Sequence, residues 1–227
     1  DGSYAYGPVV THSFRQTDDY YVILTVKDSY GNMGFKKQNV FVGRPQGWSE
    51  KTHSKNAEPD YNLLFPDDKV LRIDIKMSQD NYRKIKTSVT DSEDPVYVPV
   101  TVSFNGGIWS SVGFKYNENG SLEALKDKTK LPFRLDFDKF EDENPGIMDQ
   151  RFLGFSSMTF DNCWNDDSFM REKIAGEIFR EGGVPAAKSS FCKVYADTGD
   201  GLKYWGLYTM TEDPSDAMLK EQFGNIE

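Results

Sequence analysis

The chain has 227 residues and a formal net charge of −9, with 37% hydrophobic and 14% aromatic residues. This length suits one or two domains, and the composition excludes a disordered chain because it supplies enough apolar side chains for a core. The acidic balance argues against nucleic acid as the main partner, since binding a phosphate backbone needs clustered Lys and Arg. No apolar run is long enough to span a bilayer, so we expect no membrane span.

The first part of the chain, residues 1–43, has a β pattern. The stretch "YYVILTVKDSYGNMGFKKQNVFV" predicts a strand, a turn at residues 28–32 and a second strand, with Val22, Leu24 and Val26 on one face. Together with the opening "DGSYAYG" and "THSF", this hairpin resembles the second half of a PKD domain, an immunoglobulin-like β-sandwich module found mostly outside cells. The resemblance implies that the first strands of that module precede residue 1.

Residues 44–66 are polar and contain three prolines. This composition predicts a linker or an ordered coil. Its aromatic and leucine residues, Trp48 and the "YNLLF" run, are expected to pack on a second domain over residues 67–227.

The second domain has an α+β pattern. Alternating apolar residues predict a strand with Leu71, Ile73 and Ile75 buried, and another with one face formed by Phe133, Leu135 and Phe137. The second strand has the polar face Arg134, Asp136 and Asp138. The stretch "VYVPVTVSFNGGIWSSVGFKY" predicts a hairpin around an Asn-Gly turn. A short helix over residues 78–89, with Ser78 as its N-cap, lies between these elements.

A longer helix is predicted after the strand "FSSMTFDN", capped by the cluster at residues 165–168 and ended by Gly182 and Gly183. Its apolar positions recur at helical spacing and predict the buried face. They are Met170, Ile174, Ala175, Ile178 and Phe179. Arg171 falls inside this face, where an ion pair with Asp136 or Asp138 would explain it. Lys173, Glu177 and Arg180 are expected on the solvated face.

The end of the chain predicts a hairpin turning at residues 197–201 and a last helix with Asp213 as N-cap and Pro214 as its first residue. The pattern therefore predicts a mainly antiparallel sheet with one central helix. Cys163 and Cys192 have no metal-ligand spacing, so no metal site is expected. Two buried thiols are favoured, and a single disulfide stays open.

The order of these elements is that of the small lobe of a protein kinase, where a strand cation holds nucleotide phosphates and a helix glutamate orients it. Five blocks resemble the CotH family in that family's order. They are "WSEKTHSKNAEPDYNLLFPDDKVLRIDI", "VPVTVSFNGGIWSSVGFKY", "KLPFRLDFDKF", "DDSFMREKIAGEIFREGGVPAA" and "KYWGLYTMTEDPSDAMLKEQFG". The founding CotH members are spore coat proteins, and the family is an atypical, reduced kinase-like fold that phosphorylates secreted or coat proteins.

The resemblance implies site residues that bind ATP. Lys130 is the candidate for the phosphate-contacting lysine, with Arg134 as its rival and Glu172 as the carboxylate that orients it. Glu212 lies where the hinge is expected, and Ser121 belongs to the family's phosphate-binding loop, which departs here from its usual Arg-Gly-Asn-Ser-Ser form. Without the resemblance, Lys130 reads as a solvated lysine and Glu212 as part of a helix cap.

The family's catalytic and metal-binding aspartates come from the lobe that follows. We therefore expect no catalytic residue within this segment, and ATP and Mg²⁺ to act in an intact protein. The expected function is a secreted CotH-like protein kinase acting on Ser or Thr of extracellular or coat proteins, with a nucleotide and a protein substrate as partners. The alternative is a non-catalytic extracellular scaffold or binding protein, such as a cell-surface or cellulosome-type component.

Overall fold

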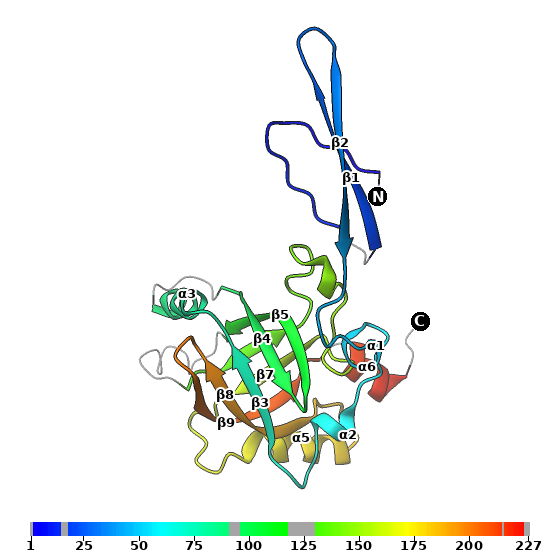
Figure 1. Cartoon of the computed structure of the whole chain (residues 1–227). Coiled ribbons are helices and arrows are strands. Elements are labelled where there is room, and N and C mark those ends of the chain that lie inside the picture. The colour runs from blue at the N-terminus through cyan, green and yellow to red at the C-terminus, as the bar shows by residue number, and fades with distance from the viewer. Residues whose placement is uncertain (1, 15–17, 91–95, 118–129, 215, 225–227) are drawn as a thin grey trace.

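The computed structural model describes residues 2–14, 18–90, 96–117, 130–214 and 216–224. They form an α+β structure in which a β-barrel carries short helices on its outside and a long hairpin projects away from it (Figure 1). No helix in these ranges is long and apolar enough to cross a membrane.

The projecting hairpin consists of β1 (Asp18–Lys27) and β2 (Met33–Val42), paired antiparallel over their whole length. Asp28 closes its turn, because its Oδ1 accepts hydrogen bonds from the backbone N–H groups of Tyr30 (2.9 Å) and Asn32 (2.8 Å). The predicted hairpin is confirmed. Its apolar row is open to solvent, with Val22 43% and Leu24 59% exposed, and the assignment to a PKD sandwich stays a prediction.

The segment between hairpin and barrel is an ordered coil with two short helices, α1 (Glu50–His53) and α2 (Tyr61–Leu64). Leu64 is buried in the barrel core, and Tyr61 packs against it, as predicted. His53 is also buried, stacked on the Trp109 ring at 4.4 Å between centroids, with its Nε2 3.0 Å from the Ile108 carbonyl oxygen. This segment is therefore anchored on the barrel wall.

The barrel contains seven strands in the order β3-β4-β5-β6-β7-β9-β8 and closes between β8 and β3. The strands are β3 (Leu71–Lys76), β4 (Val98–Phe104), β5 (Gly107–Tyr116), β6 (Phe133–Asp136), β7 (Ser157–Asp161), β8 (Ser189–Asp197) and β9 (Leu202–Glu212). All pairs are antiparallel except β3 with β8. The predicted antiparallel sheet is thus confirmed, while the closing parallel pair joins segments far apart in sequence and was not foreseen.

Alternation along the strands builds the core. Leu71, Ile73 and Ile75 face inward, as predicted. Phe133 stacks between Phe114 and Phe160 at centroid distances of 4.9 and 4.4 Å, so aromatic rings fill the middle of the barrel. The inward direction of these residues fixes which polar side chains of the same strands point outward.

The other helices are α3 (Gln79–Thr90), the 3₁₀ turn η1 (Pro145–Ile147), α5 (Arg171–Glu181) and α6 (Asp216–Phe223). The Ser78 hydroxyl accepts a hydrogen bond from the Asn81 backbone N–H at 3.1 Å, which confirms the predicted N-cap of α3. The predicted start of the last helix is wrong. The helix begins at Asp216, and the Asp213 carboxylate binds Arg134 and Ser157.

The predicted orientation of α5 is also wrong. Its apolar residues Ile174, Ile178 and Phe179 are 42%, 62% and 53% exposed, while Lys173 is buried. The Lys173 ammonium group lies 2.7 Å from the carboxylates of both Asp67 and Glu177. Glu177 belongs to the same helix, so the ion pair with Asp67 is the one that joins the polar face of α5 to the rest of the protein.

Arg171 does not pair with Asp136 or Asp138. Its guanidinium donates to the Asn165 carbonyl oxygen (2.8 Å) and lies 3.5 Å from the Asp166 carboxylate. The Asp166 carboxylate also accepts the Arg171 backbone N–H at 3.0 Å, which confirms that the cluster at residues 165–168 caps this helix.

Candidate functional site

Strands β6, β7 and β9 carry polar side chains on the outside of the barrel wall. In the strand registers, Arg134 lies opposite Thr159, and Thr159 lies opposite Thr211. We call this surface the outer polar face. Its members are Arg134, Asp136, Ser157, Thr159, Asp161, Thr209, Thr211 and, just beyond β9, Asp213. Because the alternate residues of these strands form the core, the fold fixes this surface on one side of the wall.

Arg134 is the cation of the outer polar face. Its Nη2 donates to the Ser157 hydroxyl oxygen at 2.8 Å and to the Asp213 carboxylate, and Ser157 Oγ donates to the same Asp213 oxygen at 2.9 Å. Burial disfavours the charged form of both side chains, but the contact between them has the larger effect. This contact raises the pKa of Arg134, and together with the Ser157 hydrogen bond it lowers the pKa of Asp213. The charge of Arg134 is therefore already balanced by a carboxylate.

Glu172 lies in the first turn of α5, beside the same surface. Its Oε1 accepts a 2.7 Å hydrogen bond from the Thr211 hydroxyl. Although the side chain reaches solvent, desolvation by the surrounding protein raises its pKa, and the charge of Asp161 adds to this while the Thr211 bond opposes it. Glu172 thus joins the helix to the outer polar face.

A depression of about 370 Å³ lies between the start of α5 and the barrel wall. Its lining residues are Asp161, Cys163, Trp164, Asn165, Asp166, Arg171, Glu172 and Thr209. The Cys163 sulfur lies 3.2 Å from Thr209 Oγ1, and burial raises the pKa of this thiol, so it is held in its neutral form. The structure contains Cys163 and Cys192 as free thiols, so no disulfide joins them.

Lys130 lies at the Asp161 end of this region, just before β6. Its ammonium group donates to the Asn162 carbonyl oxygen at 2.8 Å and lies 4.6 Å from the centre of the Phe169 ring. Burial lowers the pKa of Lys130, and the negative charge of Asp161 opposes this shift. In the described part of the chain, Lys130 and Glu172 form no ion pair with each other.

A glycine of β9 makes room for Lys130. A Cβ atom added to Gly206 would lie 3.0 Å from Lys130 Cε, and the φ of Gly206 is +149°. A larger residue here would be strained and would push the lysine away.

Glu212 lies on the opposite side of the wall from Thr211, in the interior, and is 1% exposed. Its carboxylate accepts hydrogen bonds from the Tyr61 hydroxyl (3.0 Å) and from the Lys188 backbone N–H (2.8 Å). Burial raises its pKa, with the hydrogen bonds opposing the shift. These contacts join the end of β9 to α2, and the proposed hinge role of Glu212 stays a prediction.

Ser121, the fifth predicted site residue, lies outside the described residues, as does the rest of the loop over 118–129. The structure therefore brings Arg134 and Glu172 to one surface, places Lys130 at its edge and places Glu212 inside the barrel. It adds Ser157, Thr211 and Asp213, which the sequence reasoning missed as site residues. The period-2 patterns "SSMTFD" and "LYTMTED" carry that signal, but only if β7 and β9 are known to be neighbours.

The fold and this surface define an α+β barrel protein with a polar, ion-paired outer face flanked by one helix. Residues 120–227 match the model of the family described as CotH kinase protein. The CotH resemblance is thereby confirmed for this part of the chain, which points to a kinase-related function. The match does not include residues 1–119, which contain the β1–β2 hairpin and the first two of the five resembling blocks, and no curated protein matches the chain.

Proposed function

We propose that this chain is part of a secreted CotH-like atypical protein kinase that transfers the γ-phosphate of ATP to Ser or Thr of extracellular or coat proteins. The family match over residues 120–227 carries the proposal. The outer polar face supports it, because Arg134, the rival to Lys130 as the expected cation, and the helix glutamate Glu172 lie on one surface, with Lys130 at its edge.

ATP, when bound, would supply the transferable phosphoryl group. We assign Arg134 as the residue that holds its phosphates, since the Ser157 hydroxyl and an anion already bind this guanidinium, and a phosphate oxygen is an equivalent acceptor. Lys130 is the second cation, at the Asp161 end of the face. Glu172 is assigned as a positioning residue that acts through its hydrogen bond with Thr211, since it forms no ion pair with Arg134 or Lys130 in the described structure. The described residues contain no group of three or more His, Cys, Asp and Glu side chains arranged to hold a metal ion.

The test is phosphotransfer from radiolabelled Mg-ATP to a mixed Ser- and Thr-containing protein substrate, with the full protein and its Glu172→Ala variant. The proposal predicts labelling that falls at least about tenfold in the variant. Equal labelling by both proteins would remove the role assigned to Glu172. Absence of labelling together with absence of nucleotide binding would contradict the kinase function.

A non-catalytic extracellular scaffold is the second candidate. This candidate is favoured because both cations of the site already have partners in the protein. Asp213 neutralises Arg134, and a backbone carbonyl oxygen accepts a hydrogen bond from Lys130. The carboxylates Asp161, Asp166 and Glu172 add negative charge beside any phosphate. This alternative predicts that no nucleotide raises the melting temperature at any Mg²⁺ concentration.

A further inference from the structure

The barrel wall has an open edge at the start of β3. This strand pairs with β8 along its whole length, Leu71–Lys76, but with β4 only over Asp74–Lys76. Beyond that point β4 ends at Phe104 and turns away. The same register places Ile73 opposite Phe104, so Leu71 and Arg72 are the residues of β3 that have no neighbouring strand on the β4 side, and such an edge offers backbone N–H and C=O groups to another chain.

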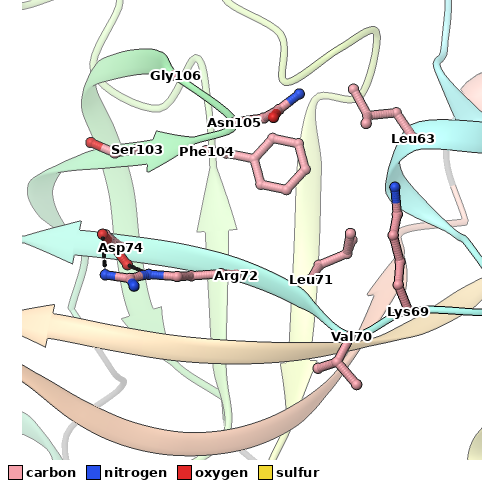
Figure 2. A pocket seen from close by; sticks show the side chains of 10 residues that line it. All are labelled: Leu63, Lys69, Val70, Leu71, Arg72, Asp74, Ser103, Phe104, Asn105 and Gly106. Atoms are coloured by element: carbon pink, nitrogen blue, oxygen red, sulfur yellow. Dashed lines mark hydrogen bonds and ion pairs between the residues drawn. The ribbon is translucent and has the colours of Figure 1, made fainter.

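A pocket of about 410 Å³ lies at this open edge, between β3 and the turn that joins β4 to β5 (Figure 2). Leu71 and Phe104 form its buried apolar wall, and Leu63 of α2 lies beside it. Figure 2 shows Lys69 next to Leu63 on one side of the opening and Asn105 on the other. The opening thus combines an unpaired strand edge with an apolar recess that one side chain can fill.

The charge at this pocket is positive. Arg72 is neutralised by Asp74, to which it donates two hydrogen bonds of 2.8 and 3.0 Å. Lys69, by contrast, is exposed and forms no ion pair within the described ranges. Lys69 lies two residues before Leu71, the first residue of β3, and Figure 2 shows both side chains on one side of the chain and Val70 on the other, so a cation and an apolar surface are presented together.

We propose that this edge binds an extended segment of a partner protein by strand addition, with an apolar residue opposite Leu71 and an acidic residue opposite Lys69. Residues two apart on a strand share a face, so the bound segment has the pattern apolar-any-acidic when it runs antiparallel to β3. Antiparallel pairing is the more stable arrangement per residue. This inference rests on the proposed function in one respect, since it makes the segment part of the kinase's protein substrate.

Backbone hydrogen bonds give such a complex its affinity, and the side-chain pocket gives it specificity. The free edge is short, so the complex is weak. The informative measurement is therefore the ratio of the affinities for peptides with an acidic or a basic residue opposite Lys69. Exchanging an acid for a lysine opposite Lys69 replaces attraction by repulsion. At an exposed site this changes the affinity by about fivefold.

The experiment titrates the ¹⁵N-labelled full chain with the acetylated, amidated hexapeptide Ser-Val-Leu-Thr-Asp-Ser and follows amide shifts by NMR. Two comparison peptides are titrated in the same way. The first has Lys in place of Asp, and the second is the original peptide methylated at the backbone nitrogens of Leu and Asp. The wild type is expected to prefer the Asp peptide by about fivefold, with shifts at residues 69–73, and to lose binding on N-methylation.

Lys69→Glu is expected to reverse the preference between the two charged peptides. Lys76→Glu, an exposed position of the same strand that is already paired with β4, is the matched control and is expected to keep it. Failure of the Asp peptide to bind, equal affinity for both charges, or an unchanged preference in Lys69→Glu would overturn the inference. The peptide titration involves no nucleotide, so a negative result would overturn this inference without bearing on the kinase proposal. The kinase proposal is tested separately by phosphotransfer.

Discussion

Arg134 and Glu172 lie at the two ends of one row of residues on the outside of the barrel. Thr159 and Thr211 form the row between them, and Thr211 donates its hydroxyl to Glu172 at 2.7 Å. Two strand spacings separate the Cα atoms of Arg134 and Thr211 by about 10 Å. Arg134 must release Asp213 before its guanidinium can pair with a phosphate instead.

The contact between Asp213 and Arg134 contributes to stability, because both side chains are only 26% exposed and no other carboxylate of the described residues forms an ion pair with this cation. Asp213→Asn is expected to lower the free energy of unfolding by about 1–2 kcal/mol. Urea denaturation measures this change.

Asp200→Asn is the control for that experiment. The side chains of its ion pair are largely exposed, Lys203 by 61% and Asp200 by 50%. The free energy of unfolding is therefore expected to change by no more than about 0.5 kcal/mol. Equal effects of the two substitutions would contradict a stabilising role for the Asp213 contact.

The inward polar face of α5 gives a second prediction. Lys173→Ala removes the ammonium group bound by Asp67 and Glu177 and is expected to lower the free energy of unfolding by about 1–3 kcal/mol. Hydrogen exchange of the α5 amides is expected to accelerate as well. Ile178→Ser, on the exposed face, is expected to change stability by less than about 0.5 kcal/mol. The reverse ranking would show that the apolar face is the packed one.

Asp136 gives a prediction about pH. Burial, followed by the hydrogen bond and charge of Asp138, raises the pKa of Asp136 to about 6. The folded chain then keeps a proton that the unfolded chain releases near pH 4, so this carboxyl destabilises the fold as pH rises from about 4 to 6.

Asp136→Asn is expected to remove that penalty. The unfolding free energy of the variant minus that of the wild type is expected to increase by about 1–3 kcal/mol between pH 4 and pH 7. Parallel stability curves for the two proteins over this range would contradict the raised pKa.

Strand positions and faces were predictable from the sequence where the period-2 pattern is strong. Phe133 and Leu135 are buried and Arg134 and Asp136 face outward, as the alternation indicates. The Asn105-Gly106 turn was predictable for a similar reason, because both residues have positive φ and the sequence supplies the two residue types that tolerate it.

The orientation of α5 was not predictable from its own sequence. Periodicity identifies an apolar face, but it does not say that this face is the packed one. Here Asp67, distant in sequence, supplies the carboxylate that holds Lys173 inward. The contacts of the candidate site residues were not predictable for the same reason, since strand order decides that Asp213 meets Arg134 and that Glu212 is buried.

The central claim is that the outer polar face holds the phosphates of ATP through Arg134. Calorimetric titration of Mg-ATP into the full chain and into Arg134→Gln tests it most directly, with Arg83→Gln, an exposed arginine of α3, as control. The account predicts binding by the wild type and the control, and affinity at least about tenfold weaker in Arg134→Gln. Equal affinity of all three proteins, or no heat of binding in any of them, would contradict it.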